Sequence, residues 1–262
     1  MRITRLDIQP SYADGFAFSW ELDPVNPPPA GVLYRVQRGD THEGPWADIS
    51  PALSGVYMWA GDGERVIHTK THVLYFRVAA TVGGKDYYSP VVQPYADITD
   101  KREFLIARNM RRHELIQMRG MGGTACRVFV KAVFGPRCTR CVDFVSGRPA
   151  RQDCVVCFGT GTEPGYHGPY DALVRFSANQ QNPGFQEGTR YVTEPSQFRL
   201  RMLGLPAVKK DDIVVDAKSD RRYMVNTVVS TVEVRRVPIV RVAEVSEITS
   251  SSPYYRVGAQ QS

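Results

Sequence analysis

The sequence lacks the short motifs that mark the common classes of enzyme. It has no HExxH pair, no serine within a GxSxG turn and no glycine-rich phosphate loop. Asp211 and Asp212 are adjacent, and neighbouring residues of a strand point to opposite faces, so we do not expect a paired acid and base. The histidines lie apart, at His42, His68, His72, His113 and His167. We therefore expect that the chain is not an enzyme.

Long apolar segments are also missing. No run approaches the roughly 20 apolar residues that span a bilayer. The opening residues, MRITRLD, do not contain the apolar core of a signal peptide. These absences predict a protein without a membrane partner that is made and folded in the cytoplasm, where thiols stay reduced.

The composition is that of an ordinary folded protein. A chain of 262 residues is long enough for two domains. Its formal net charge of +6 permits contact with nucleic acid. The 33 basic residues are scattered among 27 acidic ones, however, so the charge alone does not indicate a nucleic-acid binder.

Cysteine is scarce, but four of the five cysteines form two CxxC pairs. Twelve residues separate the pairs, and the four cysteines are Cys138, Cys141, Cys154 and Cys157. Each pair offers two thiolates on a tight turn, and this spacing is typical of one tetrahedral zinc site per chain. The alternatives are two disulfides, or thiols that never meet. Four protein ligands leave zinc no open position for a substrate, so the predicted role of the metal is structural.

The fifth cysteine, Cys126, belongs to an alternating pattern. Apolar residues recur at every second position from Cys126 to Phe134, which predicts a strand with one buried face. Because Cys126 has no partner in a CxxC pair, we expect a small buried hydrophobic residue and not a fifth metal ligand.

Residues 1–94 show the pattern of short strands that is typical of a β-sandwich. Phe16, Phe18, Trp20 and Leu22 alternate with smaller or polar residues. The same part contains Trp20, Tyr34-Arg35-Val36, Gly44-Pro45-Trp46, Phe76-Arg77-Val78-Ala79-Ala80 and Ser89-Pro90. At these residues the part resembles a fibronectin type III domain, and such domains serve as rigid adhesive or spacer modules.

Residues 95–120 are predicted to be a linking helix. Asp100 and Glu103 form a capping pair, no proline or glycine interrupts residues 101–119, and Gly120 ends the run. The helix is basic, and we expect a subunit contact at Arg108, Arg111 and Arg112. A solvated basic face is the alternative.

The rest of the chain is again rich in strands. Residues 121–250 are predicted to form one β-domain, with the four-cysteine segment, residues 135–170, as a zinc-ribbon-like insert. The β-branched residues of 171–248 favour a small barrel or sandwich. The polar residues 251–262 are predicted to be a tail. The expected fold class is therefore mainly β with one helix.

A second resemblance depends on several stretches within residues 95–250, namely 137–143, 154–161, 165–169, 208–214, 223–225 and 237–241. In these stretches the chain resembles virion structural proteins of tailed bacteriophages, and the carboxyl part is similar to head-closure or neck proteins. The resemblance implies a neck subunit that is assembled in the host cytoplasm. It would form a sixfold or twelvefold homo-oligomeric head-to-tail connector ring between a portal or adaptor and tail-terminator-like proteins. DNA would pass through this ring, and the fibronectin-like domain would project as a collar.

A second hypothesis comes from the cysteine pattern. The alternative function is a zinc-ribbon nucleic-acid-binding protein that carries an adhesive β-sandwich domain. The neck hypothesis requires rings of subunits, whereas the nucleic-acid hypothesis does not.

Overall fold

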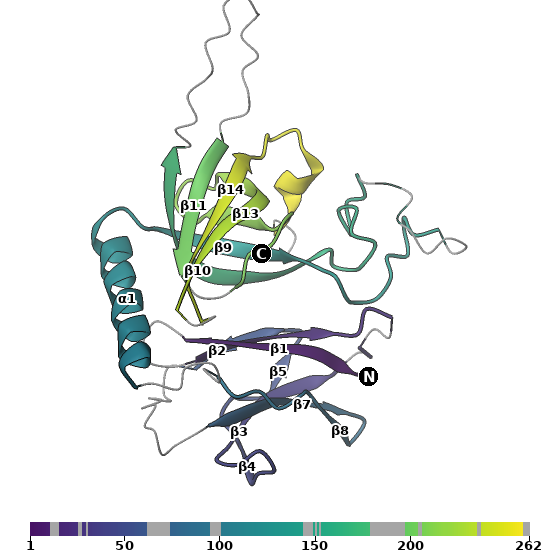
Figure 1. Ribbon diagram of the computed structural model, residues 1–262. Coiled ribbons are helices and arrows are strands. Elements are labelled where there is room, and N and C mark those ends of the chain that lie inside the picture. The colour runs from purple at the N-terminus through teal and green to yellow at the C-terminus, as the bar shows by residue number, and fades with distance from the viewer. Residues whose placement is uncertain are drawn as a thin grey trace, which may run out of the picture.

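The computed structural model confirms a mainly β chain with one long helix (Figure 1). It describes residues 1–10, 16–25, 28–29, 31–61, 74–94, 101–143, 149, 151, 153–178, 197–203, 206–234 and 237–258. Two β-rich bodies lie one above the other in Figure 1, with the helix α1 at their side. The lower body is built from the first third of the chain.

The lower body contains two antiparallel sheets. One consists of β1 (Ile3–Pro10), β2 (Phe16–Leu22) and β6 (Met58–Ala60), in that order. The other has the order β4-β3-β7-β8, with β5 paired to β3. Its strands are β3 (Leu33–Gly39), β4 (Trp46–Asp48), β5 (Leu53–Ser54), β7 (Tyr75–Val82) and β8 (Lys85–Tyr88).

The two sheets share one aromatic core. The period of two along β2 buries Phe18 and Trp20 on the same side, as the sequence predicts. The ring of Trp20 lies 5.5 Å from that of Tyr34 on β3, and the ring of Phe18 lies 5.1 Å from that of Phe76 on β7. Phe134, which comes from the cysteine-bearing segment, completes this core. The core of the first third of the chain therefore includes a residue from beyond position 94.

The helix α1 (Lys101–Gly120) covers the uninterrupted run of residues 101–119 and ends at Gly120 as predicted, and the predicted residues 95–100 before it lie outside the described part of the chain. Its last turn is closed by two backbone hydrogen bonds, from Met121 N to Gln117 O and from Gly123 N to Met118 O. The predicted cap Asp100 lies outside the described residues. Ala107 and Met118 pack against Ile239 of the upper body. Within the described part of the chain, no helix is long and apolar enough to cross a lipid bilayer.

The upper body is a closed barrel of six strands in the order β10-β11-β14-β13-β12-β9. Its strands are β9 (Thr124–Lys131), β10 (Tyr166–Ala178), β11 (Gln197–Leu203), β12 (Ile213–Asp216), β13 (Arg222–Val234) and β14 (Val237–Glu247). The sequence favours either a small barrel or a sandwich here, and the structure shows that these strands form a barrel. Closure requires β9, because β9 pairs with both β10 and β12. The cysteine segment therefore leaves the barrel at the end of one strand and returns at the start of the next.

The end of the chain corrects one prediction. Residues 251–262 were predicted to be a polar tail, but residues 251–258 pack on the barrel. They contain a short 3-10 helix, η1 (Pro253–Arg256), and Val257 is buried among Phe129 and its neighbours. Arg222 Nη1 donates a hydrogen bond of 2.6 Å to the carbonyl oxygen of Val257. The segment packs on the barrel because of the apolar contacts that Val257, Tyr254 and Tyr255 make there, although most of its residues are polar.

Asp211 and Asp212 precede β12 and do not lie within a strand, which corrects the assumption made from the sequence. Asp211 has a φ of +70° and pairs with Lys131 Nζ at 2.9 Å. Asp212 is buried, and its carboxylate accepts backbone hydrogen bonds from Lys131 N and Lys209 N. Burial raises the pKa of Asp212 to about 6, although these two N–H groups oppose the change. Asp212 therefore joins β9 to the segment before β12.

Candidate metal centre

The segment between β9 and β10 brings four cysteine sulfurs together. The Sγ atoms of Cys138, Cys141, Cys154 and Cys157 all lie within 4.8 Å of one another, and all four residues are buried. The Sγ atoms of Cys138 and Cys154 are 3.8 Å apart, and those of Cys141 and Cys157 are 3.1 Å apart. Four thiolates about 2.3 Å from one ion would place their sulfurs about 3.8 Å apart. The four residues therefore fit one tetrahedrally bound metal ion.

The structure contains these residues as thiols. All five cysteines are free. A disulfide needs two sulfurs about 2.05 Å apart, and the closer of these two pairs is 3.1 Å apart. Each close pair joins one cysteine of the first CxxC to one of the second, so the two turns face each other as the spacing predicts.

Both CxxC turns aim backbone N–H groups at the sulfur of their first cysteine. Arg140 and Cys141 supply them to Cys138, and Val156 and Cys157 supply them to Cys154. For Cys154, burial opposes ionisation, but these N–H groups and hydrogen bonds from the thiols of Cys141 and Cys157 together outweigh it and lower the pKa to about 7. For Cys138, burial dominates and the pKa is raised. Metal ions bind the thiolate, so donors of this kind prepare the site for a cation.

The second CxxC turn is held by its own backbone. Phe158 N donates to the carbonyl oxygen of Cys154 at 2.8 Å, and the hydroxyl of Thr160 donates to that of Cys157 at 2.8 Å. Cys138 N donates to the carbonyl oxygen of Gly161 at 2.9 Å, which ties the first turn to the second. Phe158 has a φ of +51°, and the glycines that follow it allow the chain to turn back.

Gly165 and Phe158 attach the centre to the end of the barrel. A Cβ at Gly165 would lie 2.6 Å from the carbonyl oxygen of Cys157, so only glycine fits there. The ring of Phe158 lies 6.1 Å from that of Tyr166 on β10 and belongs to the cluster that contains Phe129 and Ile213. A metal ion at the cysteines would therefore fix the segment to the barrel.

Cys126 is separate from this centre. It is 2% exposed within the barrel core, and burial raises the pKa of its thiol to about 12. The prediction of a small buried hydrophobic residue is confirmed.

The three arginines predicted at a subunit contact differ in exposure. Arg112 is exposed on α1, whereas Arg111 is buried. The side chain of Arg108 lies outside the described part of the helix. A contact with another subunit can use Arg112 directly, but Arg111 is already covered within its own chain.

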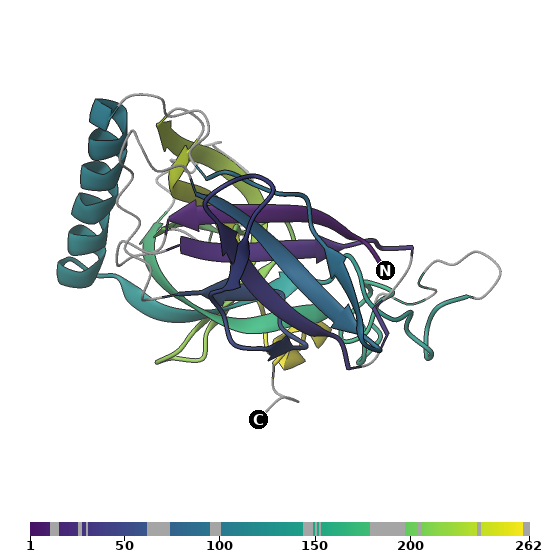
Figure 2. The ribbon, with the colours of Figure 1, turned by 90° about the horizontal axis from the view of Figure 1, so that it is seen from below.

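The site and the helix lie at opposite ends of the molecule. Figure 2, seen from below, shows α1 at one end and the cysteine-bearing segment at the other. No model of a known protein family matches the chain, and no curated protein matches its sequence. Fold and site together define a mainly β protein with a six-stranded barrel and a four-cysteine centre that can hold one metal ion.

Proposed function

We propose that this chain is a structural, non-enzymatic subunit of the neck of a tailed bacteriophage virion, and that copies of it form the connector ring between head and tail. The observation that carries the proposal is the outward side of α1. Among the helix residues whose side chains are described, it exposes the large apolar residues Leu105, Ile106, Met110 and Ile116 between polar ones. Several large apolar side chains exposed on one helix are typical of a surface that packs against another protein.

Basic residues accompany this apolar surface. Arg112 and Arg119 are exposed on the same helix. Complementary charge contributes more to the orientation and rate of association than to its net free energy. A ring needs head-to-tail contacts, in which α1 of one copy meets a different surface of the next. We propose that α1 and the barrel lie near such a ring, through which DNA passes between portal or adaptor and tail-terminator-like proteins.

We propose zinc as the metal of the four-cysteine centre. Zinc prefers four thiolates in a tetrahedron, and a closed set of four protein ligands serves structure and not reaction. When bound, the ion would supply the cross-link that ties both CxxC turns to the barrel end. The chain's own residues orient the sulfurs, through the N–H groups of the two turns and the close approach of Gly165 to Cys157.

We propose that residues 1–94 form a fibronectin type III-like module that projects as a collar. Two antiparallel sheets over one aromatic core are the architecture that such domains share with other sandwiches. In Figure 1 these sheets lie below the barrel. This placement suits a module at the periphery of a ring built from barrels.

A zinc-ribbon nucleic-acid-binding protein remains the second candidate. The observation that favours it is a group of exposed arginines around the cysteine centre, namely Arg137, Arg140 and Arg151. Basic residues on a small metal-bound module can neutralise phosphates.

Native mass spectrometry of the metal-loaded chain, alone and with its portal, separates the two candidates. The connector proposal expects rings of six or twelve copies, formed alone or on the portal, with one zinc per chain. A monomer or twofold dimer under both conditions would contradict it. Salt-dependent binding of nucleic acid by such a monomer would instead support the second candidate.

A further inference from the structure

Residues 253–258, which we call the closing segment, pack on the end of the barrel that adjoins the metal centre. Val257 of this segment is buried in a cluster of side chains that also contains Phe158 and Tyr166. Phe158 lies in the cysteine-bearing segment, and Tyr166 is the first residue of β10. The closing segment is therefore in contact with side chains that border the metal centre, although most of the barrel strands separate them in the chain.

The backbone of the metal centre places both of these side chains. Phe158 directly follows the ligand Cys157, and its N–H donates to the carbonyl oxygen of the ligand Cys154 at 2.8 Å. Tyr166 directly follows Gly165, where a Cβ would lie 2.6 Å from the carbonyl oxygen of Cys157. The second CxxC turn is thus continuous with the seat of the closing segment.

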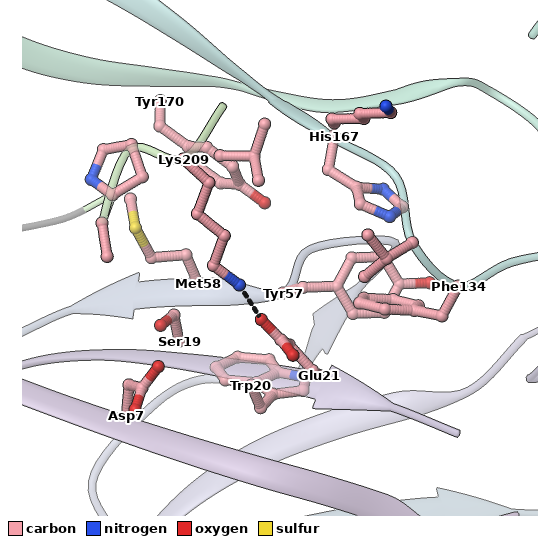
Figure 3. Close-up of a pocket in the computed structure, with 15 residues that line it drawn as sticks. Asp7, Ser19, Trp20, Glu21, Tyr57, Met58, Phe134, His167, Tyr170 and Lys209 are labelled. Carbon is pink, nitrogen blue, oxygen red and sulfur yellow. Dashed lines mark hydrogen bonds and ion pairs between the residues drawn. The ribbon is translucent and has the colours of Figure 1, made fainter. Parts of the chain in front are cut away.

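Tyr166 has further support that does not involve the cysteines. Its hydroxyl donates to the carbonyl oxygen of Asp211 at 3.2 Å. Its neighbour His167 lines the pocket between the β1-β2-β6 sheet and the barrel, where its ring lies 4.7 Å from that of Tyr57 and 4.8 Å from that of Phe134 (Figure 3). These contacts hold the start of β10 by themselves. Phe158 lies outside the barrel strands, so its place depends on the turn that carries it.

The closing segment is short and is held by few contacts. Beside the hydrogen bond to the carbonyl oxygen of Val257, the guanidinium carbon of Arg222 lies 4.7 Å from the centre of the Tyr255 ring. Gly258 has a φ of +80°, and a Cβ there would lie 2.4 Å from a ring atom of Phe129. A segment of this length does not keep its structure alone, so its docking depends on each buried contact.

We propose that metal binding at the four cysteines docks the closing segment: the bound centre fixes the second CxxC turn, this turn holds Phe158 in the cluster, and the cluster holds Val257. The proposal rests on the proposed metal centre and is independent of the connector ring. Coupling between two sites is reciprocal, so docking strengthens metal binding by the same factor by which metal binding strengthens docking. The closing segment therefore acts as a strap whose position follows the state of the centre.

The test is hydrogen exchange, followed by NMR, of the full-length protein with and without zinc. The N–H groups of Tyr255 and Val257 donate backbone hydrogen bonds at η1, and we expect zinc to slow their exchange at least about fivefold. Val225 N, which donates to a carbonyl oxygen at 2.9 Å within the barrel, is the reference and should change much less. In Phe158→Ala, which keeps all four cysteines, zinc should no longer slow the exchange of the closing segment.

A second measurement begins at the closing segment. Gly258→Ala places a Cβ against the ring of Phe129 and should weaken zinc binding at least about fivefold, as measured by competition with a chelator. Gly84→Ala is the matched control. Gly84 has a similar φ of +78° but no atom within 4 Å of the added Cβ, so the affinity for zinc should stay that of the wild type.

The outcomes separate this coupling from the metal centre itself. One zinc per chain by elemental analysis, with exchange of the closing segment unchanged by zinc, would overturn the coupling and leave the centre intact. A chain that binds no zinc would overturn both. Wild-type affinity for zinc in Gly258→Ala would also overturn the coupling, and this result can be obtained even where Phe158→Ala does not fold.

Discussion

Cys154 and Cys126 show how the same side chain takes two roles. Cys154 accepts hydrogen bonds from backbone N–H groups and from the thiols of Cys141 and Cys157, which lower its pKa to about 7, whereas burial in the barrel core raises the pKa of Cys126 to about 12. Only the first environment favours the thiolate that a metal ion requires.

Replacing one ligand should therefore release the metal. We expect Cys154→Ser to lose zinc and to disorder the segment between β9 and β10, since structural zinc contributes on the order of 10 kcal/mol of apparent binding free energy. Elemental analysis and hydrogen exchange measure both effects. Cys126→Ala is the control: it should keep one zinc and cost only about 1 kcal/mol for a small cavity. Zinc retained in the first variant, or lost in the second, would show that the ligand assignment is wrong.

His167 makes stability depend on pH. Its side chain takes up a proton near pH 6.5 in the unfolded chain but only near pH 4 in the folded protein, because burial disfavours the charged form. Between these values the unfolded state binds more protons, so the contribution of His167 is complete above pH 6.5 and is lost as the pH falls to 4. Asp212, whose pKa is raised to about 6, acts in the opposite direction.

Comparison with His167→Phe isolates the histidine, because Asp212 is common to both proteins. The free energy of unfolding of the wild type should fall relative to that of the variant by about 3 kcal/mol between pH 6.5 and pH 4. Urea titrations at several pH values measure this difference. A difference that does not vary with pH would mean that His167 is exposed in solution.

For single residues, the sequence predicts those contacts that depend on spacing within a short segment. The two CxxC pairs are close in the chain, so their meeting was predictable. Trp20 and His167 line one pocket only because the β1-β2-β6 sheet packs against the barrel, and no short motif records that contact. Trp20 belongs to an alternating stretch and His167 lies beside glycine in the sequence. These patterns indicate a strand or a turn, but they do not specify which residue is the neighbour.

Among the elements, the turn that includes Gly165 has a strict steric requirement. Gly165→Ala places a Cβ against the carbonyl oxygen of Cys157, at a φ of +86°. We expect a loss of roughly 2 kcal/mol or more in the free energy of unfolding, together with weaker metal binding. Gly84→Ala is the matched control, because Gly84 has a similar φ of +78° but no atom within 4 Å of the added Cβ. Equal losses in the two variants would show that the close approach does not matter.

Two neighbouring arginines of α1 allow an effect on folding to be distinguished from an effect on assembly. Arg112→Glu changes an exposed residue, so it should leave the free energy of unfolding within about 0.5 kcal/mol of the wild type and reduce ring formation. Arg111→Glu changes a buried charge and should cost about 3 kcal/mol of folding free energy. Urea unfolding and native mass spectrometry measure the two effects. Normal rings from Arg112→Glu would contradict a contact at this residue.

Helices and strands could be predicted from the sequence where the apolar residues follow a single period. The alternation in β2 and β9 and the uninterrupted run of α1 specify a strand or a helix locally. Closure of the barrel could not be predicted from the sequence in the same way. β9 and β10 pair with each other although the whole cysteine segment separates them in the chain. The register between such distant strands depends on the complete set of strands. The docking of residues 251–258 was missed because one buried residue, Val257, outweighs a polar composition.

For the whole molecule, the first third of the chain was predicted to fold alone, with a boundary at Tyr95 that lies outside the described residues. We expect residues 1–94 to fold as an isolated fragment, because two sheets close one core. The fragment should be about 3 kcal/mol less stable than the same region in the full chain, since it lacks Phe134. Tryptophan fluorescence during urea unfolding measures this, because Trp20, Trp46 and Trp59 all lie within residues 1–94. Phe134→Ala in the full chain should show a similar loss, and a fragment that does not fold would refute an independent core.

An electron cryo-microscopy map of purified particles that contain this chain tests the connector function most directly. The account predicts six or twelve copies in a ring between portal and tail, with α1 and the barrel at subunit contacts, the β1-β2-β6 sheet and its partner sheet at the periphery, and density for one ion among four cysteines of each copy. Absence of the chain from the neck, or copies arranged only as twofold dimers, would contradict the account.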